Sequence, residues 1–340
     1  MKKIFVFISC LSFLAILLTG CAKWTDAEQL VVQRLDADSN SLGPNYKKYL
    51  ESLRSYKQSA HPQVIGFFDA KNWNLDNGKQ NTFLYNLPDS LDMICAINQT
   101  GALTPAQLAD MTSTRATKGT KMLMMLDFKK MNDDLKKRLP VSPAGDLVNT
   151  TINTYTDSVL NVYQQNKYDG IYLLYEDLYC FNCSEVLSDI SRVSAIITRL
   201  AASANAKKLL LQSKGTDALF LTPEAAGKID FFVVNSLNVA GASYYVYDGL
   251  LDLYSSINGF SSSKMMLTAS FQGDRWKLGG DPFPNGGGTF IGTATALARW
   301  NVTGGRKGGL GIYYVEQDYN NNPPYKYARE AIQMINPAVK

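Results

Sequence analysis

The feature that most constrains the fold is a regular alternation of short β-type runs with turns and helical patterns. Eight such runs occur, at residues 64–69, 93–98, 121–128, 170–176, 208–212, 231–235, 264–271 and 309–315. Parallel strands need long crossovers, which are usually helices. Eight strand–helix units over roughly 280 residues match the size of a closed (β/α)8 barrel, the TIM barrel, and we predict that α/β fold.

Helical spacing is clearest after the fourth run. There Ser184 is a candidate cap, and apolar residues repeat at helical intervals from Val186 to Leu200. The connections after the first and fifth runs show no clear helix. A doubly wound open sheet is the alternative, but it normally has fewer strands and, for nucleotide binding, a glycine-rich first turn that this chain lacks. Further helical patterns span 105–116, 146–165, 250–257, 290–300 and 325–335.

The N-terminal sequence resembles a bacterial lipoprotein signal. Two lysines precede an apolar run at 4–18, and the small-residue segment Leu18-Thr19-Gly20 leads to Cys21. The resemblance implies cleavage before Cys21 and acylation of that cysteine. A transmembrane anchor is the alternative, but the run is shorter than the roughly 18 to 20 apolar residues that span a bilayer. We therefore expect a signal peptide at 1–20, a lipidated tether with a short helix at 21–60, and the barrel at 61–340.

Charge and cysteine content exclude several classes of function. Loss of residues 1–20 removes two of the 34 basic residues and none of the 30 acidic ones, which leaves 32 against 30, a net charge of +2. This balance argues against nucleic acid or an anionic membrane surface as a partner. With His61 as the only histidine and no second cysteine pair beside Cys180 and Cys183, we expect no metal site and no cofactor. Cys180 and Cys183 are expected to form a local disulfide or to be two free thiols.

The fourth run, "YDGIYLLYEDLY" at 168–179, carries the most specific motif. Residues 169–176 resemble the signature of glycoside hydrolase family 18, the chitinases and endo-β-N-acetylglucosaminidases, commonly written Asp-Gly-x-Asp-x-Asp-x-Glu. The opening Asp-Gly pair and Glu176 fit, whereas Tyr172 and Leu174 replace the two central aspartates. The last run, "KGGLGIYYVEQDY", is also similar to the endoglycosidase branch. The resemblance implies a lipoprotein of the glycan-uptake systems of Bacteroidetes-like bacteria.

The resemblance also implies what the missing acids would do. In this family the glutamate protonates the leaving oxygen while the acetamido group of the substrate attacks the anomeric carbon. The aspartate two residues earlier orients that acetamido group and stabilises its charge, and Leu174 can do neither. Asp177 lies on the opposite face of the strand from Leu174 and Glu176, so it cannot readily replace the missing aspartate without a bulge or a register slip. Loss of one such contact costs on the order of a hundred- to a thousand-fold in rate, so we expect little or no turnover.

Polar and aromatic residues follow the predicted strands at the end where TIM barrels bind ligands. Aromatic rings cover the apolar face of a sugar, and amides and carboxylates bind its hydroxyl groups. Trp73 and Trp276 are the preferred stacking residues because each lies in a polar loop, and the segment 272–288 is a candidate wall or lid. Trp300 is expected to pack against the barrel. The predicted ligand-binding residues are Trp73, Tyr172, Glu176, Tyr179, Asn235, Tyr244, Tyr245, Gln272, Trp276 and Glu316.

Three functions fit these residues. The favoured one is an inactive family 18-like lipoprotein of the outer membrane, on the cell surface or the periplasmic face, that captures N-acetylglucosamine-containing glycans of the N-glycan type. The second is a hydrolase that uses Glu176 as general acid with Asp127 or Glu316 as its partner. The third is a non-binding subunit of an outer-membrane transporter. The missing aspartates argue against the second, and the loop aromatics argue against the third.

Overall fold

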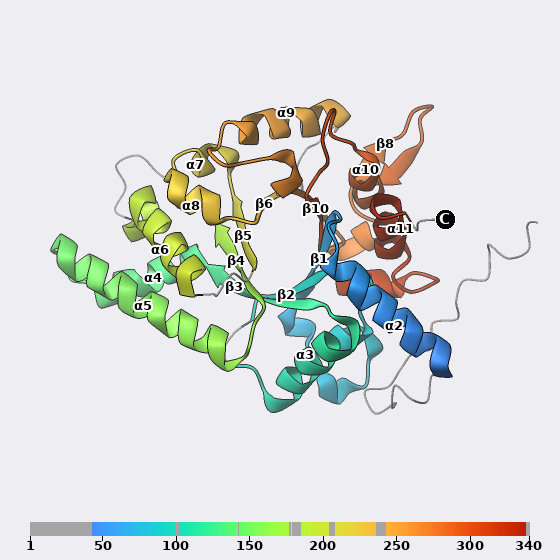
Figure 1. The fold of residues 1–340 in the computed structure, drawn as a ribbon, viewed down its shortest axis with the longest axis horizontal. Helices are drawn as coiled ribbons and strands as arrows, with labels where there is room; N and C mark the ends of the chain where they lie inside the picture. The colour runs from blue at the N-terminus through green and yellow to red at the C-terminus, as the bar shows by residue number, and fades with distance from the viewer. Residues whose placement is uncertain are drawn as a thin grey trace, which may run out of the picture. The chain divides into compact units, whose positions relative to one another are not determined.

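The protein folds into a closed barrel of eight parallel strands with helices around it (Figure 1). The computed structural model describes residues 43–99, 102–141, 143–176, 178, 185–203, 208–235 and 243–337. Each predicted β-type run forms a barrel strand, so the TIM-barrel prediction is confirmed. In chain order the barrel strands are β1 (Gln63–Asp69), β2 (Met93–Ile97), β3 (Lys121–Asp127), β4 (Gly170–Tyr175), β5 (Lys208–Ser213), β6 (Phe231–Val234), β7 (Met265–Ser270) and β10 (Gly309–Tyr313).

The connections follow the predicted pattern with one omission. As expected, β1 and β5 are followed by short elements, the 3-10 turns η2 to η5 between Ala70 and Asn86 and the helices α7 (Gly215–Ala218) and α8 (Pro223–Lys228). Helix α4 (Phe128–Arg138) was not predicted. The longer helices at predicted positions are α3 (Pro105–Lys118), α5 (Gly145–Gln165), α6 (Ile190–Ser203), α10 (Thr293–Arg299) and α11 (Lys326–Ile335). Helix α9 (Tyr244–Ser255) overlaps the predicted helix at 250–257 but begins six residues earlier.

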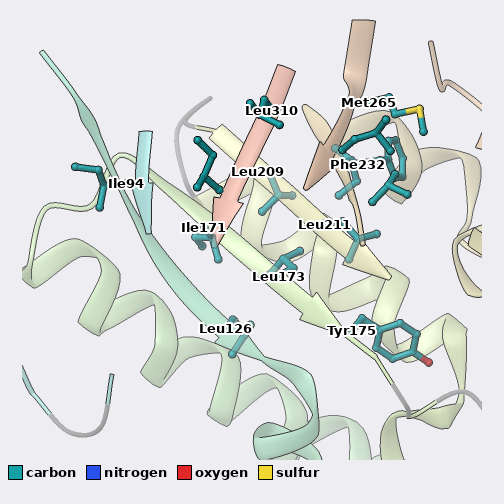
Figure 2. Close-up of a cluster of buried hydrophobic side chains, with 14 of the residues drawn as sticks. Ile94, Leu126, Ile171, Leu173, Tyr175, Leu209, Leu211, Phe232, Met265 and Leu310 are labelled. Carbon is teal, nitrogen blue, oxygen red and sulfur yellow. The ribbon is translucent and has the colours of Figure 1, made fainter. Parts of the chain in front are cut away.

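Strand alternation divides the apolar residues into two clusters. One fills the inside of the barrel and includes Phe67, Leu123 and Tyr172. The other lies between the strands and the helices, and Figure 2 shows its members Ile171 and Leu173 on one face of β4. Successive side chains of a strand point to opposite faces, so Tyr172, Leu174 and Glu176 all face the inside of the barrel.

Helix α2 (Gly43–Gln58) is part of the barrel body and not of a spacer. Leu50 is buried, and the Lys57 Nζ donates to the backbone oxygens of Asp89 and Leu91, each at 2.6 Å. Arg54 Nη1 donates to the backbone oxygen of Thr117 at 2.7 Å. The predicted boundary after residue 60 is therefore wrong, because buried contacts hold this helix to the barrel.

The predicted signal peptide and Cys21 lie outside the described residues, as do Ser184, Cys180 and Cys183. Among the residues that the structure does describe, we find no helix with the length and apolar character needed to cross a membrane.

Candidate active site

Glu176 belongs to a chain of hydrogen bonds across the C-terminal mouth of the barrel. Gln212, at the end of β5, donates its Nε2 hydrogen to Glu176 Oε1 at 2.8 Å and accepts at Oε1 from the hydroxyl group of Tyr313 at 2.6 Å. The Tyr313 hydroxyl also lies 2.7 Å from that of Tyr172. Residues from β4, β5 and β10 are thus joined, and the carboxylate has a polar partner inside the mouth. We call Tyr172, Glu176, Gln212 and Tyr313 the mouth network.

Ring packing holds Tyr313 in this position. Its ring stacks on Phe67 with the centroids 4.2 Å apart and the planes at 11°, and Phe67 lies 4.9 Å from the ring of Tyr172. Gly311 leaves the space for this stack, because a Cβ atom there would lie 3.0 Å from Phe67 and 2.8 Å from Thr268. Burial raises the pKa of both tyrosines above their usual range, so both hydroxyl groups stay neutral hydrogen-bonding groups.

Leu174 lies on the inner face of β4 between the two ends of the network. It is half-buried and packs against the interior cluster. Its register partners are Asp127 on β3 and Gln212 on β5. Asp127 caps helix α4 with Oδ1, which accepts from the backbone N–H groups of Lys129 at 2.8 Å and Lys130 at 3.3 Å. The carboxylate nearest in register is therefore occupied by a helix cap.

Glu316 is a buried linker between two loops and not a ligand contact. It is 1% exposed in the 3-10 turn η9 (Val315–Asn320). Its Oε1 accepts from Asn72 Nδ2 at 3.1 Å, and its Oε2 accepts a longer bond from the backbone N–H of Asp69 at 3.4 Å. Burial raises the pKa of Glu316 to about 7. The prediction that Glu316 contacts a ligand is wrong, because almost none of its surface is open.

The preferred stacking residue Trp73 is also a core residue. It is 5% exposed, its Nε1 donates to Asp110 Oδ2 at 2.9 Å, and its ring packs edge-on against Phe68. A platform for sugars needs an open ring face, so this prediction is wrong. Tyr172 is 1% exposed and reaches the mouth only through its bond to Tyr313, so its predicted direct contact is wrong as well. Trp300 packs in the core as predicted, with Nε1 bonded to Asp248.

The other predicted ligand residues lie on the connections after β6 and β7. Tyr244 is 39% exposed and Tyr245 is 85% exposed at the start of α9, while Asn235 and Gln272 are exposed at strand ends. Trp276 is half-buried in the 3-10 turn η8 (Gly273–Lys277). Tyr179 lies outside the described residues. These positions keep the residues available for a ligand, which the predictions require.

A small hairpin adds an aromatic residue that the sequence did not predict. Strands β8 (Pro282–Pro284) and β9 (Phe290–Gly292) pair antiparallel within and just beyond the segment that was a candidate wall. The hairpin buries Phe283 against Tyr244, with ring centroids 5.1 Å apart, and leaves Phe290 58% exposed. The helix predicted from residue 290 begins only at Thr293, and the glycine-rich "NGGG" turn before it was the available signal for a hairpin.

The barrel and the position of Glu176 at the end of its fourth strand define a protein of the glycoside hydrolase type. Residues 25–334 match the family described as "Glycoside hydrolase family 18, BT1044-like", and the chain belongs to that family.

Similar proteins agree with this assignment. The curated protein endo-β-N-acetylglucosaminidase F2 of Elizabethkingia meningoseptica is 23% identical over 365 residues, which cover 98% of both chains. A solved structure of a BT1044 variant in its selenomethionine form is 21% identical with a TM-score of 0.73, and the match covers 88% of this chain and 95% of that one. An endo-β-N-acetylglucosaminidase from Cordyceps militaris in apo form is 18% identical with a TM-score of 0.63, covering 85% and 96%. The structural likeness confirms the fold, and the family match indicates a glycan-related function.

Proposed function

We propose that this protein is a glycan-binding lipoprotein in which a family 18 barrel keeps a binding groove and has lost hydrolysis. The observation that carries the proposal is the side chain of Leu174 on the inner face of β4, two residues before Glu176. An apolar group at this position cannot orient an acetamido group or stabilise the positive charge that develops on it. Glu176 keeps a hydrogen-bond partner and remains able to accept from a sugar hydroxyl.

Asp127 and Glu316, the two carboxylates considered as partners of Glu176 in a hydrolase, are already engaged in other contacts, and so is Asp69. Asp127 caps α4, and Glu316 is buried between Asn72 and Asp69. Asp69 accepts at Oδ1 from the Asn98 side chain at 3.1 Å and from the backbone N–H of Lys71 at 3.2 Å. Within the described ranges, these engagements favour binding over the alternative, a hydrolase that uses Glu176 as general acid.

The ligand class that we propose is an N-acetylglucosamine-containing glycan of the N-glycan type. Two relatives are named endo-β-N-acetylglucosaminidases, and the Cordyceps enzyme was also solved as a double mutant in complex with fucosyl-N-acetylglucosamine-Asn. In that mutant an aspartate and the glutamate two residues after it are replaced by their amides, and this spacing equals that of Leu174 and Glu176 here. The exposed rings of Tyr244 and Tyr245, with Trp276, supply faces on which sugars stack.

We further propose that acylated Cys21 anchors the protein in the outer membrane, where it serves a glycan-uptake system beside a transporter and companion lipoproteins. The lipoprotein-like N-terminal sequence supports this location. Metabolic labelling with a radioactive fatty acid tests it, because label is expected in the wild type and not in Cys21→Ala. Equal labelling of the two would refute the anchor.

Calorimetry with a soluble form, residues 22–340, tests the binding function. We expect heat on titration with N-glycans or chitin oligomers, and an intact glycan in the same mixtures by mass spectrometry after a day. Tyr245→Ala is expected to weaken binding by about 1 to 3 kcal/mol if its ring stacks on a sugar, on the scale of base–aromatic stacking. Tyr49→Ala, a 43% exposed tyrosine on α2, is the matched control. Cleaved glycan would establish the hydrolase instead, and no heat with any glycan would refute both.

A further inference from the structure

The opposite end of the barrel carries a pocket with a different chemistry. A cavity of about 420 Å³ opens where β1, β3, β5 and β6 begin, at the N-terminal end of the strands. It lies at the far end of the strands from the mouth network. No aspartate or glutamate is among the described residues that line it. Its basic lining residues are Arg54, Lys57, His61, Lys121, Lys208, Arg306 and Lys307.

Two of these cations are used by the fold. Lys307 Nζ donates to the backbone oxygens of Leu297 and Ala298 at 2.6 and 2.7 Å, which satisfies the C-terminal end of α10. Lys57 binds two backbone oxygens and the hydroxyl of Thr120. The donors of both ammonium groups are used, and burial lowers the pKa of Lys57 to about 7 and that of Lys307 to about 8. We therefore do not count these two groups among the donors for an anion.

The aspartates nearest to the pocket are also engaged. Each precedes an even-numbered strand and accepts a hydrogen bond from a backbone N–H of the strand before it, which fixes the register of the barrel. Each also pairs with one cationic or imidazole side chain. The backbone bonds join Asp92 to Val64 at 2.7 Å, Asp169 to Met122 at 3.0 Å, and Asp230 to Leu209 at 2.8 Å.

Lys121 and Arg306 are the basic lining residues for which the preceding contacts give no partner. Neither has an ion pair or a hydrogen bond from its side chain to the part of the chain that the structure describes, and the Arg54 guanidinium uses one of its donors on Thr117. The pKa of Lys121 is lowered by burial and by the neighbouring charge of Lys208. The charges of Asp92, Asp169 and Asp230 oppose this effect on Lys121, but burial and Lys208 outweigh them, so a bound anion would favour the charged form of Lys121.

We propose that this pocket binds an anion of the phosphate class, either inorganic phosphate or a phosphomonoester. Unpaired guanidinium and ammonium groups around one cavity are the donors that bind such oxygens most strongly. The volume falls within the usual range for small-molecule sites, so a phosphate with an attached group fits. The whole chain carries a formal net charge of only +4, so its overall charge does not reveal this local cluster of cations.

Thermal unfolding of the soluble form with inorganic phosphate tests the proposal. We expect a saturable rise in Tm that sodium chloride at equal ionic strength does not reproduce, since screening alone acts equally in both. Lys121→Gln with Arg306→Gln is expected to abolish the rise, with roughly tenfold lost affinity for each charge-assisted hydrogen bond removed. Lys129→Gln with Arg299→Gln removes the same charge from exposed positions outside the pocket and is expected to leave the rise unchanged.

Two further measurements distinguish a soluble phosphomonoester from a lipid headgroup as the ligand. Glycerol 3-phosphate reports a soluble phosphomonoester, and cosedimentation with vesicles containing phosphatidic acid, against pure phosphatidylcholine, reports a lipid headgroup. Absence of a phosphate-specific rise, or an equal rise in the Lys121/Arg306 double variant, would overturn the proposal. Should the double variant not fold, Arg306→Gln alone carries the test, because Arg306 is exposed. Glycan titrations of the same variants are expected to match the wild type, which separates this site from the proposed function.

Discussion

The buried carboxyl group of Glu316 makes a quantitative prediction about stability and pH. Its pKa of about 7 in the folded protein compares with 4.5 for an exposed glutamate. Each pKa unit corresponds to about 1.36 kcal/mol, so the difference amounts to about 3 kcal/mol. Because the folded pKa is raised, the unfolded chain releases this proton first as the pH increases. Stability from Glu316 is therefore complete below about pH 4.5 and is lost as the pH rises to about 7.

The variant Glu316→Gln removes this titration while keeping the shape of the side chain. The glutamine side chain places its NH2 group, which cannot accept a hydrogen bond, toward either Asn72 or the backbone N–H of Asp69. We therefore expect the free energy of unfolding of the variant to be about 1 kcal/mol lower near pH 4.5, where folded wild-type Glu316 is neutral. Between about pH 4.5 and pH 8 the free energy of unfolding of the variant should gain up to about 3 kcal/mol relative to the wild type. Urea unfolding of both proteins at several pH values measures the difference, in which other titrating groups cancel.

A flat difference across this pH range would refute this reasoning. It would mean that the folded protein hydrates the carboxylate of Glu316 or supplies it with a cation. Glu224→Gln is the matched control, because that side chain is exposed on α8 and is solvated in both states. Its difference from the wild type should stay small at every pH.

Three substitutions test the assignments at the mouth and in the core. Trp73→Ala should lower the free energy of unfolding by about 3 to 5 kcal/mol in urea titrations, as for other buried tryptophans, and leave glycan affinity unchanged; lost affinity without lost stability would restore it as a binding residue. Tyr313→Phe deprives Tyr172 and Gln212 of their partner and should cost about 1 to 3 kcal/mol, with weaker glycan binding by calorimetry. Leu174→Asp should fold, because this side chain is only half-buried, and mass spectrometry should detect more glycan cleavage than in Leu174→Asn. Equal cleavage by the Asp and Asn variants would mean that Leu174 is not what blocks hydrolysis.

The strands were predictable because each is a short run with turns at both ends, buried on both faces. That pattern is local, and the structure places each strand end within two residues of the prediction. Helix α4 was missed for a local reason too. Its sequence, FKKMNDDLKKR, is mostly charged, and its buried side is only Phe128, Met131, Asn132 and Leu135. With so few apolar residues the helical period is hard to see.

The errors in the site come from contacts between residues far apart in the sequence. Trp73 looks exposed in its polar loop, but its partner Asp110 lies 37 residues later. Glu316 binds Asn72, which lies 244 residues earlier. No periodicity in the sequence reports such pairs. Tyr313 was missed although it shares the inner face with Gly311, and a tyrosine above a glycine at a strand end is a signal that an inner-face analysis can use.

Strand alternation also explains how one barrel separates two kinds of chemistry. On β3 and β5 the inward positions begin with Lys121 and Lys208 and end with Asp127 and Gln212. Cations thus gather where the strands start, and neutral or capped polar groups gather where they end. On β4 the same face carries Leu174 instead of an acid, which removes a negative neighbour from Glu176. Glu176 is thus a single carboxylate flanked by the amide of Gln212 and the apolar side chain of Leu174, and a carboxylate can accept hydrogen bonds from hydroxyl groups. The leucine at position 174 leaves the hydrogen bond between Gln212 and Glu176 in place, and under the proposed function a glycan bound at the mouth is expected to stay intact.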